Sequence, residues 1–278
     1  MKSLQGKIAL VTGASRGAGR GIALELGKAG ATVYVTGRSV QGQTTNDWPG
    51  TIDDTAFDIT AAGGEGIAVR CDHTHDDKVE ALIERIRQEQ GKLDLLVNNV
   101  WGGNELAIHS EPFWQMPLTH WDNMFTAGVR AQLVTNYYAA PLMRESGNGL
   151  IVHTTSWDDG KYTGHFFYDL AKNALTRMAY GLSIELKKDD ITVLALSPGW
   201  MRTELVLSEF NTDEEHWQQV DALKQTESPH YIGRAVTALA SDPHVFTKTG
   251  QVLRVGELAQ EFHFTDIDGR QVPPFRLT

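Results

Sequence analysis

Short runs of apolar residues alternate along the chain with longer stretches in which apolar positions recur every three or four residues. Runs such as Lys7–Thr12 and Leu150–Thr155 are rich in Val, Ile and Leu, which is typical of strands buried on both faces. Stretches such as Gly19–Ala29 and Asp76–Gln90 have the period of amphipathic helices. This alternation predicts a parallel sheet that is covered by helices on both faces.

The complete pattern predicts seven strands and the helices that connect them. With right-handed crossovers, such a chain forms a doubly wound Rossmann fold, which is a three-layer α/β/α sandwich. No stretch has the composition of an interdomain linker, so we expect a single domain over residues 1–278. The expected strands are Lys7–Thr12, Thr32–Thr36, Gly66–Cys71, Leu93–Asn98, Leu150–Thr155, Ile191–Ser197 and Gln251–Val255. The expected helices are Gly19–Ala29, Ile52–Ala62, Asp76–Gln90, Phe166–Lys188 and Tyr231–Ala240, with Thr119–Ser146 mostly and Thr203–Lys224 partly helical.

Two segments interrupt this alternation. Val40–Gly50 is polar, contains Gly and Pro, and exceeds the roughly 2–6 residues usual for such a connection. Near the end of the chain, Asp268-Gly269 lies between apolar residues and predicts a type I′ hairpin. We therefore expect residues 257–278 to form a hairpin-like surface tail that covers the edge of the sheet. A flap beside a substrate pocket and a contact between subunits are the alternatives.

Charge and cysteine content exclude several classes of protein. The 278 residues carry a net charge of −10, which argues against nucleic acid or an anionic membrane as a partner. A single cysteine, Cys71, excludes an internal disulfide and a multi-cysteine metal site. No apolar run reaches the ~20 residues of a membrane span, and the N-terminus lacks a signal-peptide cleavage site. We expect a soluble, cytoplasmic protein.

Three glycines, Gly13, Gly17 and Gly19, follow the first predicted strand and precede the first predicted helix. Glycines permit a tight turn and a close approach of the backbone to a pyrophosphate, while the helix N-terminus supplies unpaired N–H groups. This loop, which includes Ser15, is therefore expected to bind a dinucleotide.

The residues after the second strand indicate which dinucleotide is bound. A fold that selects NAD carries an acidic residue there, which binds the ribose 2′-hydroxyl group. This chain has Arg38 and Ser39 instead, and Arg16 lies in the glycine loop. Two guanidinium groups and a hydroxyl group suit a 2′-phosphate, so NADP(H) is the expected cofactor.

Polar residues also follow other predicted strands. The Asp72 carboxylate either accepts a hydrogen bond from the adenine amino group or, as Thr74 also can, caps the next helix. His73 and His75 have no evident third partner, so we expect no metal site. Asn98 ends the fourth strand. Ligands of open α/β sheets bind outside these strand ends.

Tyr168 and Lys172 are four residues apart in a predicted helix and therefore share one of its faces. A free tyrosine has a pKa of about 10, and a nearby ammonium group favours its ionised form. Tyr168 is thus a candidate general acid or base for a carbonyl–alcohol pair. Ser156, just after the fifth strand, can hydrogen-bond the reacting oxygen, and Thr155 is the alternative.

Together these motifs resemble those of the classical short-chain dehydrogenase/reductases, over about Gly6 to Val255. The resemblance implies an NADP(H)-dependent oxidoreductase that interconverts a carbonyl and an alcohol by hydride transfer, with Tyr168 as general acid/base. It implies that Lys172 binds the nicotinamide ribose and lowers the pKa of the tyrosine. The implied catalytic residues are Ser156, Tyr168 and Lys172. The implied cofactor contacts are Gly13, Ser15, Arg16, Gly17, Gly19, Arg38, Ser39, Asp72, Asn98, Tyr168, Lys172, Pro198, Gly199 and Thr203.

Two positions depart from the family pattern. Val100-Trp101-Gly102 follows Asn99 where the family has Ala-Gly, which predicts that Trp101 crowds the nicotinamide side. Gly128 stands where the family carries a helix asparagine of its proton relay. The relay from Lys172 then needs water on a backbone carbonyl, or Asn123 or Asn136 from the same helix.

Further segments resemble a narrower group of NADPH-dependent carbonyl reductases within the family and imply the same activity on a broad range of substrates. These segments are Phe113-Trp114, Trp121-Asp122, Gly128-Val129-Arg130, Gly250-Gln251-Val252-Leu253 and Asp266-Ile267-Asp268-Gly269-Arg270.

Aromatic residues gather in Val100–Pro117 and Trp200–Tyr231, which we expect to wall the substrate pocket. They predict a small carbonyl or alcohol substrate that is apolar or aromatic, unless they belong to the core. They are Trp101, Phe113, Trp114, Trp200, Phe210, Trp217 and Tyr231.

Two other functions compete with this prediction. A catalytically silent NADP-binding sensor has no need of the serine, tyrosine and lysine together. A nucleotide-sugar epimerase or dehydratase uses the spacing Gly-x-x-Gly-x-x-Gly, which this chain lacks. The resemblance also implies a homodimer or homotetramer that pairs the helices within 119–146 and 166–188.

Overall fold

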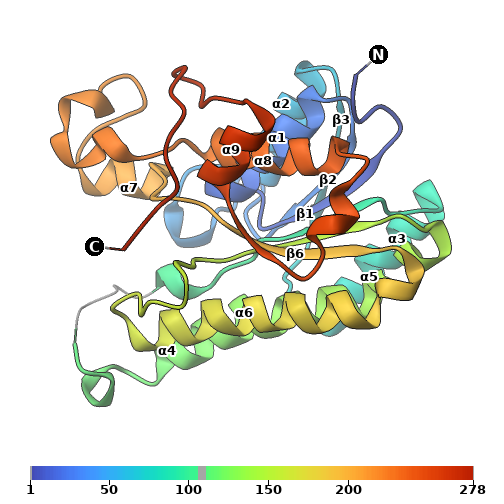
Figure 1. The fold of residues 1–278 in the computed structure, drawn as a ribbon, viewed down its shortest axis with the longest axis horizontal. Coiled ribbons are helices and arrows are strands. Elements are labelled where there is room, and N and C mark those ends of the chain that lie inside the picture. Colours follow the sequence, from blue (N-terminus) through green and yellow to red (C-terminus); the bar gives the residue numbers. More distant parts are fainter. Residues whose placement is uncertain (1, 106–110, 278) are drawn as a thin grey trace. The chain divides into compact units, whose positions relative to one another are not determined.

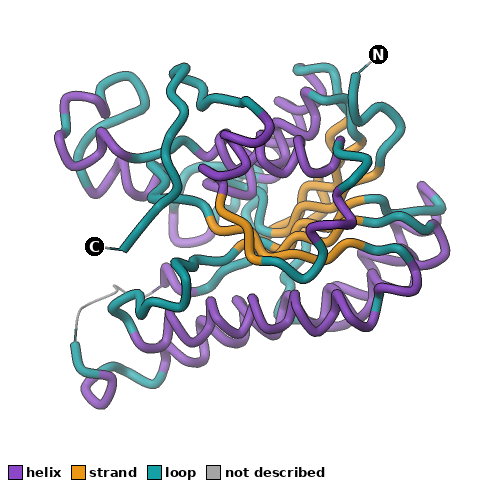
Figure 2. Tube along the Cα trace, in the orientation of Figure 1, coloured by secondary structure: helices purple, strands orange, loops and turns teal. Residues whose placement is uncertain are grey.

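Seven strands form one sheet in the order β3-β2-β1-β4-β5-β6-β7 in the computed structural model, which describes residues 2–105 and 111–277 (Figures 1 and 2). The pairs β1–β2, β2–β3, β4–β5 and β5–β6 run parallel. The predicted doubly wound α/β fold is therefore confirmed. The strands are β1 (Ile8–Thr12), β2 (Thr32–Gly37), β3 (Glu65–Arg70), β4 (Leu95–Asn98), β5 (Leu150–Thr154), β6 (Thr192–Ser197) and β7 (Val252–Arg254).

Helices flank this sheet, and most of them begin and end close to the predicted residues (Figure 1). The α-helices are α1 (Gly17–Lys28), α2 (Ile52–Ala61), α3 (Asp76–Gln90), α4 (Thr119–Trp121), α5 (Ala131–Ser146), α6 (Phe166–Glu185), α7 (Glu204–Glu209), α8 (Pro229–Ser241) and α9 (Val255–Phe262). The 3₁₀ helices are η1 (Thr45–Asp47), η2 (Gly103–Glu105), η3 (Phe113–Gln115), η5 (Lys187–Asp189), η6 (Trp217–Gln219), η7 (Asp221–Gln225) and η8 (Val245–Lys248).

The chain divides into two compact units, each built from several segments. The first unit comprises Met1–Arg70, Pro198–Asp242 and Leu253–Phe275, and the second comprises Cys71–Ser197, Pro243–Val252 and Arg276–Thr278.

In the first unit, α1 and α8 pack with their backbones in close approach. A Cβ atom added to Gly21 would lie 2.0 Å from the carbonyl oxygen of Pro229, so only glycine fits at this crossing. Ser228 caps α8 by accepting a hydrogen bond from the His230 N–H, and Pro229 starts the helix, where its missing N–H is harmless.

In the second unit, the helical stretch 119–146 is continuous but not uniform. Its middle part, η4 (Asp122–Arg130), is a π-helix, and Gly128 is buried within it. Apolar periodicity predicted the helix but not its π segment, because the shift of one residue per turn is small against the spread of apolar positions. π segments are frequent at functional sites.

The tail does not form the predicted hairpin. Val255–Phe262 is the helix α9, and the structure assigns no strand to residues 263–277. The predicted turn is present: Gly269 N–H donates to the Asp266 carbonyl group, and Asp266 N–H donates to Arg270. Only Gly269 of this turn has a positive φ (+84°), so it is not the type I′ turn, which needs two such residues. The residues of α9 favour a helix, and the turn follows it without strand partners.

The described helices include none that is both long and apolar enough to cross a bilayer. Cys71 is a buried free thiol, and burial raises its pKa to about 12.

Candidate active site

Tyr168 and Lys172 lie in the first two turns of α6, as their spacing predicted. The Lys172 side chain is buried, and its Nζ lies 5.5 Å from the centre of the Tyr168 ring. Burial raises the pKa of Tyr168 above its usual value, a hydrogen bond with Ser156 acts in the opposite direction, and Asp169 raises it further. Burial lowers the pKa of Lys172 to about 7. Tyr168 is therefore protonated at neutral pH, while Lys172 is close to its titration midpoint.

Ser156 and Thr155 have different partners. The Thr155 hydroxyl group donates a 2.8 Å hydrogen bond to the backbone carbonyl group of Lys172, so it supports the helix. Ser156 is the hydroxyl residue that reaches the phenol of Tyr168. The arrangement favours Ser156 over Thr155 as the group beside the reacting oxygen.

His165 caps α6 and is a residue that the sequence did not single out. Its Nδ1 accepts a 3.1 Å hydrogen bond from the backbone N–H of Tyr168, and its ring lies 5.2 Å from that of His120. Both histidines are buried, and burial lowers the pKa of His165. A neutral ring is required for this cap, which satisfies the N–H of Tyr168 in the first turn of the helix. Histidine is not among the preferred N-cap residues, so no sequence signal marked it.

Trp101 contacts both residues of the Tyr168–Lys172 pair. The Nζ of Lys172 lies 3.8 Å from the centre of the Trp101 ring, and the rings of Trp101 and Tyr168 meet edge to face at 5.6 Å. A Cβ atom on Gly128 would lie 2.7 Å from this indole. The two departures from the family pattern are thus in contact with each other.

Asn98 begins a chain of buried hydrogen bonds that all run in one direction. Its Nδ2 donates to Asn136 Oδ1 (2.8 Å), Asn136 Nδ2 donates to His153 Nε2 (3.2 Å), and His153 Nδ1 donates to Gln132 Oε1 (2.8 Å). Gln132 then donates to the carbonyl group of Val100. Asn136 is consequently engaged beneath the strands, and its amide is not available to Lys172 as a relay group.

The glycine loop of the first unit has the backbone that its sequence predicted. Gly13 and Gly17 have φ values of +66° and +53°, and α1 begins at Gly17, two residues earlier than predicted. The N–H of Gly17 donates a 2.9 Å hydrogen bond to the Glu204 carboxylate. An anion thus already lies at the helix N-terminus, which is the position suited to phosphate.

Arg16, Arg38 and Ser39 also lie close together in the first unit. Arg16 Nη2 donates to Ser39 Oγ (2.9 Å) and to the carbonyl groups of Trp48 and Gly50, which fastens the 40–50 loop to the glycine loop. The Nε of Arg16 is buried without a hydrogen-bond partner in the described residues. Arg38 is exposed, and its charge helps to lower the pKa of Arg16 after the larger effect of burial.

The Asp72 side chain makes hydrogen bonds to a residue two positions further along the chain. Its Oδ1 accepts hydrogen bonds from the N–H (3.1 Å) and the hydroxyl group (2.7 Å) of Thr74. Neither residue is the helix cap, because α3 starts after His75. His73 is buried against Thr135, and burial lowers its pKa to about 4. The described residues contain no group of three or more His, Cys, Asp or Glu arranged to hold a metal ion.

Pro198, Gly199 and Thr203 form the segment between β6 and α7. Thr203 caps α7 by accepting a hydrogen bond from Val206 N–H. Behind the segment lies Glu227, which is 1% exposed and accepts a hydrogen bond from Gly199 N–H. Burial raises the pKa of Glu227 to about 8, so this carboxyl group is neutral at pH 7.

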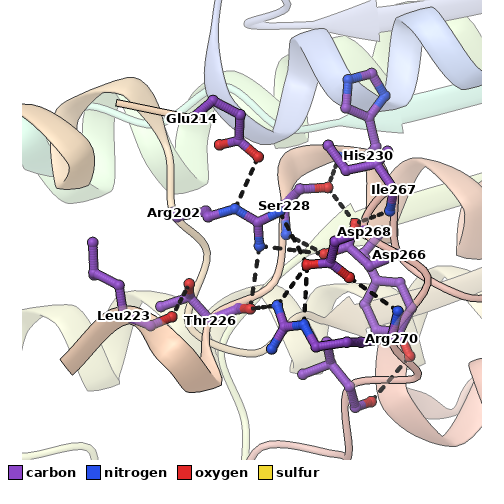
Figure 3. A network of polar contacts seen from close by, with 12 residues as sticks. Arg202, Glu214, Leu223, Thr226, Ser228, His230, Asp266, Ile267, Asp268 and Arg270 are labelled. Carbon is purple, nitrogen blue, oxygen red and sulfur yellow. Dashed lines mark hydrogen bonds and ion pairs between the residues drawn. The ribbon is translucent and has the colours of Figure 1, made fainter. Parts of the chain in front are cut away.

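A buried polar cluster holds this segment to the tail (Figure 3). The fully buried Arg202 pairs with Glu214 (2.9 Å), Asp266 (3.4 Å) and Asp268 (3.5 Å). Asp266 also accepts hydrogen bonds from the N–H and the hydroxyl group of Ser228. Asp266 and Asp268 therefore tie the tail to the rest of the first unit.

The tail continues this role with Arg270, whose Nη2 donates to the carbonyl group of Thr226 (2.9 Å). Both Arg202 and Arg270 lie near the ring of Trp217, at 4.1 and 4.9 Å. In the second unit, the N–H of Leu277 donates to the buried carboxylate of Asp158 (2.7 Å). These contacts do not match a simple surface hairpin over the sheet edge.

The seven aromatic residues differ in exposure, and Trp101 and Phe210 are partly buried. Trp217 and Tyr231 are core residues at 4% and 0% exposure, so their assignment to a pocket wall is wrong. Phe113, Trp114 and Trp200 are exposed and remain candidate wall residues. Residues 106–110 of the predicted wall lie outside the described residues.

The first unit carries a dinucleotide-type glycine loop and the second unit carries a Ser–Tyr–Lys group, a combination typical of oxidoreductases of the Rossmann type. Comparison with known proteins supports this class of protein. Residues 13–256 match the family model described as enoyl-(acyl carrier protein) reductase. The chain is 35% identical over 280 residues to dehydrogenase/reductase SDR family member 1 of Mus musculus, covering 98% of this chain and 87% of that protein.

Solved structures are similar over nearly the whole chain. One is a 7α-hydroxysteroid dehydrogenase complexed with NADH and 7-oxoglycochenodeoxycholic acid (TM-score 0.74, 27% identity, 90% of this chain and 93% of that chain). Another is a metagenomic short-chain oxidoreductase in complex with NADP (TM-score 0.70, 25% identity, 91% and 98%). The chain belongs to the short-chain dehydrogenase/reductase family of oxidoreductases.

Proposed function

We propose that this protein is an NADP(H)-dependent carbonyl reductase/alcohol dehydrogenase in which Tyr168 is the general acid/base. The observation that carries the proposal is the pair of a partly buried Tyr168 and a buried Lys172 on one face of α6, with Ser156 beside the phenol. A sensor that only binds the dinucleotide has no use for these three groups together.

The residues of the first unit fit a dinucleotide phosphate. The Gly17 N–H donates to the Glu204 carboxylate, and the buried Nε of Arg16 has no hydrogen-bond partner among the described residues. Relatives have been solved with NADH and with NADP, so the choice between them rests on this chain's own residues. Arg16, Arg38 and Ser39, with no acidic residue at the end of β2, favour a 2′-phosphate and hence NADP(H).

Each residue of the Ser–Tyr–Lys group has one task in carbonyl reduction. The bound nicotinamide supplies the hydride. Ser156 donates a hydrogen bond to the carbonyl oxygen, and Tyr168 gives its phenolic proton to that oxygen as the alcohol forms. Lys172, when protonated, stabilises the tyrosinate that remains. In alcohol oxidation the same groups act in reverse, and Tyr168 accepts the proton.

The substrate class follows from the exposed aromatic residues Phe113, Trp114 and Trp200, which favour an apolar or aromatic carbonyl compound. The solved 7α-hydroxysteroid dehydrogenase holds 7-oxoglycochenodeoxycholic acid, a ring-bearing carbonyl compound. We propose a working location in the cytoplasm, since the one cysteine is a buried thiol.

We also propose self-association as a homodimer or homotetramer. The outer faces of α5 and α6 expose large apolar side chains that a second subunit would cover: Leu133, Tyr137, Leu170, Tyr180 and Ile184. Sedimentation velocity of the purified chain measures this directly.

The first test is NADPH consumption with a panel of ketones, quinones and aldehydes, comparing the wild type with Tyr168→Phe. We expect turnover by the wild type, a loss of at least about 100-fold in kcat for the variant, and much weaker activity with NADH. Phe keeps the ring and removes only the hydroxyl group. Tyr162→Phe, an exposed tyrosine of the preceding loop, is the matched control. NADPH binding without turnover of any carbonyl would favour the sensor, and equal rates for Tyr168→Phe and wild type would remove Tyr168 from the mechanism.

A further inference from the structure

Trp101 occupies a space that two glycines leave open. A Cβ atom added to Gly103 would lie 2.5 Å from indole Cζ2, and one added to Gly128 would lie 2.7 Å from Cε3 and Cζ3. Real side chains do not tolerate such distances, so any other residue at either position would displace the indole. The position of Trp101 and the identity of Gly128 therefore depend on each other.

The indole contacts the proposed proton-transfer pair directly. Lys172 Nζ lies 3.8 Å from the centre of the Trp101 ring, within the range of a cation–π interaction. The Tyr168 ring meets the same indole edge to face at 5.6 Å and an angle of 85°. Among the described residues, no side chain or carbonyl group accepts a hydrogen bond from Nζ. The aromatic face of Trp101 is thus a direct contact of this ammonium group and lies closer to it than the Tyr168 ring does.

Gly128 lies in the π-helix η4, directly beneath this contact. The family resemblance places a relay asparagine at this position. Asn136, on the same helical stretch, is bonded to Asn98 and His153 and cannot substitute for it. The chain therefore has an aromatic ring where a polar side chain was expected.

We propose that Trp101 is a positioning residue of this enzyme: its indole, admitted by Gly103 and Gly128, holds the Lys172 ammonium group against the Tyr168 phenol in place of a polar relay. This inference rests on the proposed function and specifies how its lysine is held. The low pKa of Lys172, which burial lowers to about 7, makes the charged form sensitive to such a partner.

The first experiment compares three variants by kcat and KM for NADPH and for the carbonyl substrate. Trp101→Leu keeps an apolar side chain but removes the aromatic face, and we expect kcat to fall at least 10-fold. Trp101→Phe keeps an aromatic face and should stay within about 3-fold of the wild type. Trp121→Leu removes an exposed tryptophan from the same region and is the matched control, with unchanged kcat.

The second experiment exploits the dependence between positions 101 and 128. Gly128→Asn alone overlaps the indole and should lose activity. The double variant Trp101→Ala/Gly128→Asn frees this space for the amide and should recover at least 10-fold in kcat over Trp101→Ala. A merely structural role for Trp101 predicts equal recovery by Trp101→Ala/Gly128→Leu, which fills the same space without an amide, whereas the proposed role predicts recovery by the amide alone.

A third measurement needs no turnover. In protein labelled with ¹³C-lysine, the Lys172 methylene protons should show an upfield ring-current shift that Trp101→Leu abolishes, with Lys172→Arg providing the assignment. Ordinary Lys172 shifts in the wild type would overturn the inference. The inference would also be overturned if Trp101→Leu kept full activity while Asn123→Ala lost it, because this result would place the relay on Asn123. If the wild type reduces no carbonyl but the shift is present, the proposed function fails while the lysine–tryptophan contact stands.

Discussion

The carboxyl group of Glu227 has a strongly raised pKa, and its surroundings explain why. Its side chain is 1% exposed, and its Oε1 has no hydrogen-bond partner among the described residues. Burial raises its pKa to about 8, Asp266 adds to this, and Gly199 N–H and Arg202 act against it. Because the folded pKa exceeds the unfolded value of 4.5, the unfolded chain loses this proton first as the pH rises. The contribution of Glu227 to the free energy of unfolding is therefore fully present below pH 4.5 and is lost as the pH rises to 8.

Glu227→Gln should therefore stabilise the protein more at high pH than at low pH. The amide keeps the shape of the neutral acid and cannot ionise, so we expect its free energy of unfolding, relative to the wild type, to be higher at pH 8 than at pH 5 by about 1–3 kcal/mol. Urea unfolding at both pH values measures this difference, and Glu209→Gln, on an exposed position of α7, is the control. A difference that does not change with pH would mean that Glu227 is ionised in the folded chain.

At the residue scale, the sequence identified side chains whose role depends on spacing and missed those whose role depends on tertiary contacts. Tyr168 and Lys172 could be placed on one face because helical geometry is local. Trp217 could not be assigned to the core, because it is buried by tertiary contacts, with Leu207 in a hydrophobic cluster and with Arg270 near its ring. The sequence also did not predict that His165 caps α6, because histidine has no preference for the N-cap position.

The contact between α7 and the start of α1 is an element-scale feature with a direct consequence for cofactor binding. Glu204, the first residue of α7, accepts a hydrogen bond from Gly17 N–H and lies near Arg16, whose pKa is lowered by burial while the charge of Glu204 acts against this. A dinucleotide phosphate bound at Gly17 would have to replace this carboxylate. The first turn of α7 and the glycine loop are therefore coupled.

Glu204→Gln should bind NADPH more tightly than the wild type. The substitution removes a negative charge from a helix N-terminus, where such a charge contributes about 0.3–1 kcal/mol, so we expect the Kd to fall about 2- to 5-fold. Titration of NADPH fluorescence measures Kd, with Glu209→Gln at the other end of α7 as the control. Weaker binding by Glu204→Gln would instead indicate that the carboxylate orders the glycine loop for the cofactor.

At the element scale, the strands and most helices follow from the order of apolar runs, and α3 has the predicted bounds Asp76–Gln90 because Gly91 ends it in a left-handed conformation. Two elements could not be predicted from the order of apolar runs. The π segment η4 packs closely against Trp101 at Gly128, a tertiary contact that no local pattern encodes. The tail was predicted as a hairpin from Asp268-Gly269, but the turn is held by tertiary contacts of Asp266 and Arg270 instead of by strand pairing.

At the scale of the whole molecule, buried neutral histidines set a limit on stability in acid. His153 and His73 are 0% and 3% exposed, and burial lowers their pKa values to about 3 and about 4. His153 is satisfied only when neutral: Nδ1 donates to Gln132, and Nε2 accepts from Asn136. Protonation of Nε2 would remove that acceptor and place a charge in the interior of the second unit.

The sign of the effect follows from these pKa values. Both folded values lie below the unfolded value of 6.5, so the unfolded chain takes up protons first as the pH falls. Stability from these groups is complete above pH 6.5 and declines below it, until the folded histidines titrate near pH 4 and 3. Each histidine contributes a slope of about 1.4 kcal/mol per pH unit in this window.

We therefore expect the free energy of unfolding to fall steeply between pH 6.5 and 4.5, and His153→Gln to reduce that slope by about 1.4 kcal/mol per pH unit. The variant will be less stable than the wild type at pH 7, because it loses packing and part of the hydrogen-bond chain from Asn98. The slope is the informative quantity, since lost packing does not depend on pH. Urea unfolding in half-unit steps of pH measures it, and His244→Gln at an exposed position should leave it unchanged. An unchanged slope in His153→Gln would mean that water reaches this ring in the folded protein and that the polar chain beneath β4 and β5 is open to solvent.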